Sequence, residues 1–275
     1  MKRKWQIGNL VTLVLFSVFF LLPIIYTVSN SFMSSAEING YYGTGSAEFH
    51  LIPDDFTLEA YKEILWDSPF YLVKFWISIL LSVLIVIGQL FVSVTAGYAF
   101  AKFEFWGRDV LFFIVITVMM MPYQVTLVSN YIVLDGMGLI GTYAALVLPA
   151  VFSPFGVFLM RQMISAMPTD IIEAARLDGA GELRILWKIV LPYSKSGVTA
   201  LVVLSFIDSW NMVEQPITFL ENPGQYPLSV FLAGITENSI PVQAVCGILC
   251  LIPVTFLFLY YRDEMAKGIG DSIWS

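Results

Sequence analysis

The chain has 275 residues, of which 58% are hydrophobic and 13% are charged, and its formal net charge is −7. An ordinary soluble domain carries charge on about a quarter of its residues, so this composition excludes one and indicates an integral membrane protein. With one histidine and no Gly-x-x-x-x-Gly-Lys-Ser/Thr loop, the sequence offers neither a catalytic triad nor that device for holding ATP. No basic patch indicates nucleic-acid binding.

Runs of about 20 predominantly apolar residues predict an all-α membrane protein with six transmembrane helices. A permease-type domain would then cover residues 7–261, between cytoplasmic tails at 1–6 and 262–275. The expected spans are Ile7–Phe32, Tyr71–Ala101, Val110–Leu134, Tyr143–Met163, Val198–Leu220 and Val242–Tyr261.

The first apolar run has two interpretations. Lys2-Arg-Lys4 precedes it and Ser34-Ser-Ala36 follows it, which is also the order of a cleavable signal peptide. A signal core has only about 7–15 apolar residues. Because this run is longer, we expect it to be retained as a transmembrane helix.

An acidic segment at residues 33–70 follows the first span and is predicted to be external. Solvation alone explains its charge better than contact with a solute-binding protein does, although both fit. His50 lies in this segment without a sequence neighbour that would make it a ligand, so no metal site is predicted. The acids are Glu37, Glu48, Asp54, Asp55, Glu59, Glu63 and Asp67.

Prolines interrupt several predicted spans. Each removes a backbone hydrogen bond, and such breaks are tolerated where neighbouring helices or a watered cavity satisfy the freed carbonyl. These prolines either kink an ordinary bundle or mark a path, and the third and fourth spans are the best candidates to line it. They are Pro23, Pro122, Pro149, Pro154 and Pro253.

Residues 164–197 form a long stretch that is rich in charge between apolar spans. A short helix is predicted from Pro168 to Asp178, and Gly179 supplies the positive φ that ends it. Ala174 and Ala175 keep one side of this helix low enough for another surface to approach. The polar residues flanking that side are Glu173, Arg176 and Asp178.

A second helix is predicted to begin at Glu182 and to end or kink at Pro192. Its apolar residues recur at helical spacing and predict one buried stripe. An amphipathic loop lying at the membrane interface is the alternative for the whole stretch. The predicted stripe consists of Leu183, Leu186, Trp187 and Val190.

The last two spans carry unusual residues. Asp208 and Glu214 are placed in the fifth span, where an ionisable group normally faces protein or water rather than lipid. Cys246 and Cys250, four residues apart in the sixth span, are predicted to be packing residues, because an intrahelical disulfide would be strained.

Basic residues predict the orientation of the chain. Every Lys and Arg except Lys62 and Lys74 lies on one side of the six predicted spans. The positive-inside rule then places both termini and the 164–197 loop in the cytoplasm. The expected location is therefore the cytoplasmic membrane, with multiple passes.

The 164–197 loop resembles the EAA motif of permease subunits of ABC importers. The likeness rests on Glu173-Ala174-Ala175-x-x-Asp178-Gly179-Ala180 and on Ile189-x-Leu191-Pro192. The surrounding chain is similar to the carbohydrate-uptake branch, which contains the smaller permease of the maltose transporter. The supporting stretches are Phe56–Tyr61, Ala96–Phe100, Met121–Pro122, Gly138–Tyr143, Phe155–Leu159 and Ser209–Asn211.

The resemblance implies a type I ABC importer permease fold that is not an enzyme. It implies a second homologous permease, an ABC ATPase dimer that binds ATP and Mg, an extracellular solute-binding protein and a carbohydrate substrate, with no cofactor in this chain. Coupling to the ATPase would use Glu173, Ala174, Ala175, Asp178, Gly179 and Pro192. Departures at Ser196, Met212 and Glu214-Gln215 leave the exact solute open among sugars, polyols and phosphate esters.

Several residues are candidates for the solute pathway or for the contact with the second permease, and we slightly favour the contact. Their acceptors, donors and aromatic faces suit a sugar or a subunit interface equally. They are Tyr123, Asp208, Trp210, Asn211 and Glu214. A secondary transporter in which Asp208 and Glu214 carry protons is the main alternative function, and a membrane enzyme is the least supported one.

Overall fold

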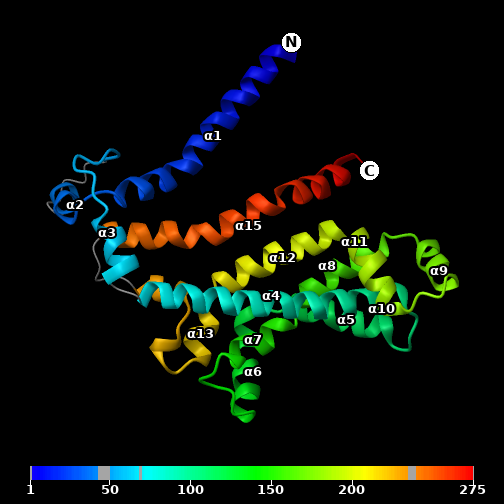
Figure 1. Cartoon of the computed structure of the whole chain (residues 1–275). Coiled ribbons are helices and arrows are strands. Elements are labelled where there is room, and N and C mark those ends of the chain that lie inside the picture. The colour runs from blue at the N-terminus through cyan, green and yellow to red at the C-terminus, as the bar shows by residue number, and fades with distance from the viewer. Residues whose placement is uncertain (1, 43–49, 68–69, 235–239, 275) are drawn as a thin grey trace. The chain divides into compact units, whose positions relative to one another are not determined.

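Figure 1 shows the computed structural model, which describes residues 2–42, 50–67, 70–234 and 240–274. Helices are the only regular elements within these ranges. Glu48 of the predicted external segment and residues 1 and 275 of the predicted tails lie outside the described residues. The packing divides the chain into two compact units, one formed by residues 1–75 and 231–253 and the other by residues 76–230 and 254–275.

The elements follow one another along the chain as labelled in Figure 1. The first half contains α1 (Lys2–Asn30), α2 (Ser35–Tyr42), α3 (Glu59–Lys62), η1 (Glu63–Asp67), α4 (Phe70–Lys102), α5 (Arg108–Met119) and α6 (Tyr123–Gly136). The second half contains α7 (Ala144–Val151), α8 (Pro154–Ser165), α9 (Thr169–Leu177), α10 (Glu182–Ile185), η2 (Leu186–Val190), α11 (Leu191–Tyr193), α12 (Lys195–Trp210), α13 (Glu214–Phe219), η3 (Pro223–Gln225), α14 (Leu228–Gly234) and α15 (Ile240–Trp274).

Four stretches of the described chain are long and apolar enough to cross a membrane as they stand. They are Asn9–Asn30, Phe70–Lys102, Ala144–Ser165 and Ile240–Glu264. Two further spans result if each of two bent helix pairs is counted as one. The structure therefore contains four to six spans by length and composition, and the upper figure matches the six predicted.

The third predicted span, Val110–Leu134, is wrong as a continuous helix. α5 stops at Met119, α6 starts at Tyr123, and the two are bent by 107°. Pro122 cannot donate to the Val118 carbonyl, and it adopts an extended conformation with ψ of 133°. The Met121 N–H satisfies that carbonyl instead, at 3.1 Å.

The fifth predicted span, Val198–Leu220, is also wrong in extent. α12 runs from Lys195 only to Trp210, and α13 is a separate short helix. Pro216 has no N–H for the Met212 carbonyl, so a helix continuing through this point would lose that bond. The Ser229 hydroxyl donates to the Met212 carbonyl instead, and Pro216 sits in the first turn of α13, where proline is tolerated.

Helix α4 approaches α8 very closely. A Cβ atom added at Gly97 would lie 2.7 Å from the Met160 Cβ and 2.9 Å from the Arg161 backbone nitrogen. Contact of this kind through small residues is the usual way in which membrane helices pack, because lipid gives them no hydrophobic drive to associate. The close contact holds the membrane end of the 164–197 loop against α4.

The two cysteines are free thiols on α15. Cys246 is fully buried, and its backbone carbonyl accepts a hydrogen bond of 3.1 Å from the Tyr71 hydroxyl. Cys250 is half-buried. Their placement agrees with the packing role predicted from their spacing.

Candidate functional site

The 164–197 loop folds as two short helices joined by a tight turn. α9 begins after Pro168, and Gly179 takes a φ of +78°, as predicted. The Gly179 N–H donates to the Arg176 carbonyl and the Ala180 N–H donates to the Ala175 carbonyl, both at 3.0 Å. This pair of bonds is a Schellman motif, which satisfies carbonyls that the helix end would leave free.

The predicted apolar stripe of the second helix is wrong for two of its four residues. Leu186 and Val190 are buried, but Leu183 is 73% exposed and Trp187 is 62% exposed. Ile185 is buried in their place. The turn from Leu186 to Val190 is π-helical, so it holds more residues than an α-turn, and a stripe counted at α-helical spacing falls out of register.

The inner face of this loop belongs to a buried core shared with three longer helices. Ala175 is part of this core, so it permits α9 to pack against its own chain, whereas Ala174 beside it is exposed. The core therefore fixes the loop to the ends of α4, α8 and α12. It consists of Val94, Tyr98, Met160, Ile164, Met167, Ile172, Ala175, Ile185, Leu186, Val190 and Leu201.

Polar bonds add a second attachment of the loop to α4. The Tyr98 hydroxyl donates to one Glu182 carboxylate oxygen and the Arg176 Nε donates to the other, each at 2.7 Å. The bond to Glu182 raises the pKa of the Arg176 guanidinium. The Lys102 Nζ donates to the Met167 carbonyl at 2.5 Å. Sequence reasoning missed Tyr98 and Lys102 as anchors, because their partners lie 84 and 65 residues away.

The outer face of the loop carries most of the residues predicted to couple to an ATPase. Glu173, Ala174, Asp178 and Gly179 are all exposed. Leu177, which the sequence analysis did not single out, is 90% exposed beside them. An apolar side chain this open, ringed by acids, is typical of a surface that meets another protein.

Pro192 lies at the far end of the loop, one residue inside α11. The stretch Glu182–Tyr193 is bent by 83° from α12, which begins at Lys195. The expectation that the second helix ends or kinks near Pro192 is therefore confirmed.

A cavity of about 900 Å³ lies within the second unit, away from the loop. Its lining comes from α4, from both halves of the broken third span, from the α7–α8 junction and from the end of α12. Four of the five candidate pathway residues line it: Tyr123, Asp208, Asn211 and Glu214. Pro149 and Pro154 of the fourth span also line it.

The fifth candidate, Trp210, lies elsewhere. It is 2% exposed and stacks on Phe206, with ring centroids 5.7 Å apart and an angle of 13° between the planes. Asp208, Asn211 and Glu214 are exposed on the isolated chain. An acid in this part of a membrane protein needs protein or water beside it, so the open side of the cavity needs a cover other than lipid.

Gln89 is a cavity residue that sequence reasoning missed. Pro154 has no N–H, so the carbonyl four residues earlier, that of Ala150, loses its helical donor. The Gln89 Nε2 donates to this carbonyl at 2.7 Å, and the Ser205 hydroxyl donates to the Gln89 Oε1. An intramembrane glutamine near an intrahelical proline was the signal available in the sequence.

The helices and their polar cavity define an all-α, multi-span membrane protein. Residues 89–268 match the family described as binding-protein-dependent transport system inner membrane component. The match covers more than half of the chain, and the chain belongs to this family. As a member, it is a non-catalytic permease subunit of an ABC transporter and a multi-pass protein of the cell membrane.

Relatives and solved structures agree with this assignment. The arabinooligosaccharides transport system permease protein AraQ of Halalkalibacterium halodurans is 28% identical over 220 residues, which are 79% of each chain. The sn-glycerol-3-phosphate transport system permease protein UgpE of Brucella abortus is 29% identical over 277 residues, covering 97% of this chain and 96% of that protein.

A chain of a solved structure is similar over nearly its whole length. It belongs to a bacterial ABC transporter involved in the import of the acidic polysaccharide alginate. Its TM-score is 0.82 and its identity is 26%, and the similarity covers 95% of this chain and 96% of that one.

Proposed function

We propose that this chain carries a carbohydrate inward across the cytoplasmic membrane and that ATP hydrolysis in a separate ATPase dimer drives it. The 164–197 loop is the observation that carries the proposal. Its inner face is held to α4, α8 and α12, while its outer face leaves Ala174, Leu177 and Asp178 exposed. A movement imposed on the outer face is then passed to the membrane helices.

The proposed orientation places this loop and both termini in the cytoplasm. The distribution of Lys and Arg supports it, because cytoplasmic loops carry the excess of basic residues. ATP and Mg would be bound by the ATPase, and this chain would hold no cofactor. Glu173 and Asp178 would make the polar contacts in the ATPase groove, with Ala174 allowing the close fit and Gly179 the turn.

A second, homologous permease is the proposed cover of the cavity. Asp208, Asn211 and Glu214 are exposed on the isolated chain, and lipid is a poor environment for them. A facing subunit would enclose these groups along a common path. A solute-binding protein would deliver the solute from outside, as the family description implies.

Carbohydrate is the proposed cargo because of the cavity lining and the relatives. The lining combines an aromatic ring, amides and carboxylates, which match the C–H faces and the hydroxyl groups of a sugar. The named relatives serve arabinooligosaccharides and sn-glycerol-3-phosphate. The described lining includes Asp208 and Glu214 but no Lys or Arg, so the part of the path that this chain supplies favours an uncharged sugar over an anionic one.

Reconstitution into liposomes tests this function. The complete importer, with both permeases, the ATPase and the binding protein, is expected to accumulate labelled oligosaccharide only when ATP is present on the ATPase side. The chain alone is expected to show no uptake under a proton gradient. Gradient-driven uptake by the chain alone, lost in Asp208→Asn or Glu214→Gln, would instead establish the proton-coupled transporter.

A further inference from the structure

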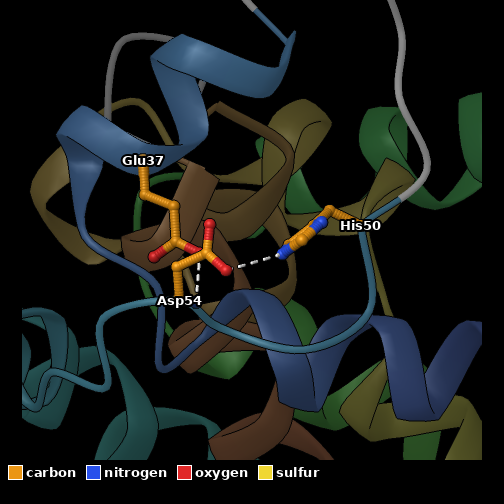
Figure 2. A group of neighbouring side chains, drawn as sticks. All are labelled: Glu37, His50 and Asp54. Carbon is orange, nitrogen blue, oxygen red and sulfur yellow. Dashed lines mark hydrogen bonds and ion pairs between the residues drawn. The ribbon is translucent and has the colours of Figure 1, made fainter.

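Three metal-ligating side chains come together in the first unit, outside the cavity and the loop. Figure 2 shows Glu37 projecting from α2 toward Asp54, with the His50 ring pointing at Asp54 from the other side. One ligand atom from each residue lies within 4.8 Å of the others. The sequence analysis gave His50 no partner, and that expectation is wrong, since its partners come from 4 and 13 residues away.

Hydrogen bonds and ring stacking hold these side chains in place. The Asp54 backbone N–H donates to the Glu37 Oε1 at 2.7 Å, and the Tyr41 hydroxyl donates to the Asp54 Oδ2. The Tyr41 ring stacks on the His50 ring, with centroids 4.2 Å apart and 10° between the planes. Outer contacts of this kind fix ligands in known metal sites.

These contacts use one oxygen of each carboxylate and leave the other. The Glu37 Oε2 is buried and accepts no hydrogen bond from any described residue. The remaining Asp54 oxygen, Oδ1, lies 3.5 Å from the His50 Nε2. Two ligands of one tetrahedral zinc ion, each at about 2.0–2.1 Å from it, lie roughly 3.3 Å apart. The observed separation is close to that value.

Electrostatics also favours a cation at this point. Glu37 and Asp54 place two carboxylates side by side, and like charges this close disfavour ionisation of both. A divalent cation among the Glu37 Oε2, the Asp54 Oδ1 and the His50 Nε2 would offset that repulsion and satisfy the buried oxygen. An ion pair between His50 and Asp54 alone would leave the Glu37 oxygen unsatisfied.

We propose that Glu37, His50 and Asp54 bind a divalent transition-metal ion of the zinc type. One imidazole and two carboxylates suit such an ion better than calcium or magnesium, which prefer oxygen ligands alone. Three protein ligands leave a fourth position for water. The ion ties α2 to the segment around residues 50–54, and this site is independent of the direction in which the chain transports its cargo.

Zinc binding to the purified full-length chain tests the site. His50 is the sole histidine of the sequence, so a purification tag without histidine makes any imidazole signal specific to this position. Equilibrium dialysis with Zn²⁺ is expected to give one ion per chain. His50→Gln and Asp54→Ala should each weaken binding at least about tenfold, since loss of even an outer contact of a metal site costs about 10–100-fold.

The matched control is Asp55→Ala, which removes the same charge one residue along from an exposed position. It should bind zinc as the natural chain does. Asp54→Ala keeps the test valid if His50→Gln fails to fold, and monodispersity in detergent checks both. Equal affinity in all four proteins would overturn the proposal.

X-ray absorption at the zinc edge identifies the ligands directly. One imidazole and otherwise oxygen ligands are expected. Sulfur in the shell would place the ion at Cys246 and Cys250 and overturn the site. Calcium that displaced zinc at equal concentration would overturn the assignment to a transition metal.

Discussion

Replacing Gly179 by valine is expected to lower ATP-driven uptake by the complete importer roughly 5- to 30-fold. Gly179 has a φ of +78°, and a left-handed conformation costs an ordinary L-residue about 1–2 kcal/mol, more when it is β-branched. A penalty of that size shifts an equilibrium by a factor of about 5–30. The turn would open, and the exposed face of α9 would lose its position. Uptake of labelled sugar and ATP hydrolysis, measured together in proteoliposomes, show the loss as uncoupling or as failure of the ATPase to assemble.

Gly181→Val is the matched control for this change. Gly181 lies two residues further along in an ordinary extended conformation, with φ of −72° and ψ of 155°, and no atom lies within 4 Å of the position of an added Cβ. Valine is compatible with that backbone, so uptake should stay near normal. Normal, fully coupled uptake in Gly179→Val would contradict the role given to the turn.

Gly97→Ala is expected to destabilise the membrane bundle by about 1–3 kcal/mol, which is the usual effect of overpacking a closely packed core. The added methyl group would lie 2.9 Å from the backbone nitrogen of Arg161, and backbone cannot rotate away as a side chain does. α4 and α8 must therefore separate, which disturbs the attachment of the 164–197 loop as well. Thermal unfolding of the purified protein in detergent should show a lower transition temperature.

Gly136→Ala is the corresponding control. It also adds one methyl group to a transmembrane region, but no atom lies within 4 Å of that position. Alanine in a helix is about 1 kcal/mol more favourable than glycine, so the transition temperature should stay constant or rise. A similar fall in both variants would show that the contact between α4 and α8 is not the cause.

Local chemistry made much of this chain predictable from its sequence. Apolar runs of sufficient length indicate the spans, because the bilayer sets their length. The turn at Gly179 and the bend near Pro192 follow from what glycine and proline can and cannot do. The position of each of these features depends on its own few residues.

Tertiary contacts decided the rest. The π-helical turn at Leu186–Val190 depends on packing against α4 and α8, so α-helical counting misplaced Leu183 and Trp187. Asp208 and Glu214 were placed in one span, yet they lie on separate helices. Gln89 meets Ser205 across 116 residues, a pairing that no local pattern encodes.

Crosslinking from α9 tests the central claim most directly. Ala174 and Ala175 are adjacent, but Ala174 is exposed and Ala175 lies in the core of the chain. In a background with Cys246 and Cys250 replaced by alanine, Ala174→Cys carrying a photoactivatable thiol reagent should crosslink to the ATPase subunit in native membranes, and Ala175→Cys should not. A crosslink from Ala174→Cys to lipid alone, or to no protein, in an assembled importer would contradict the account.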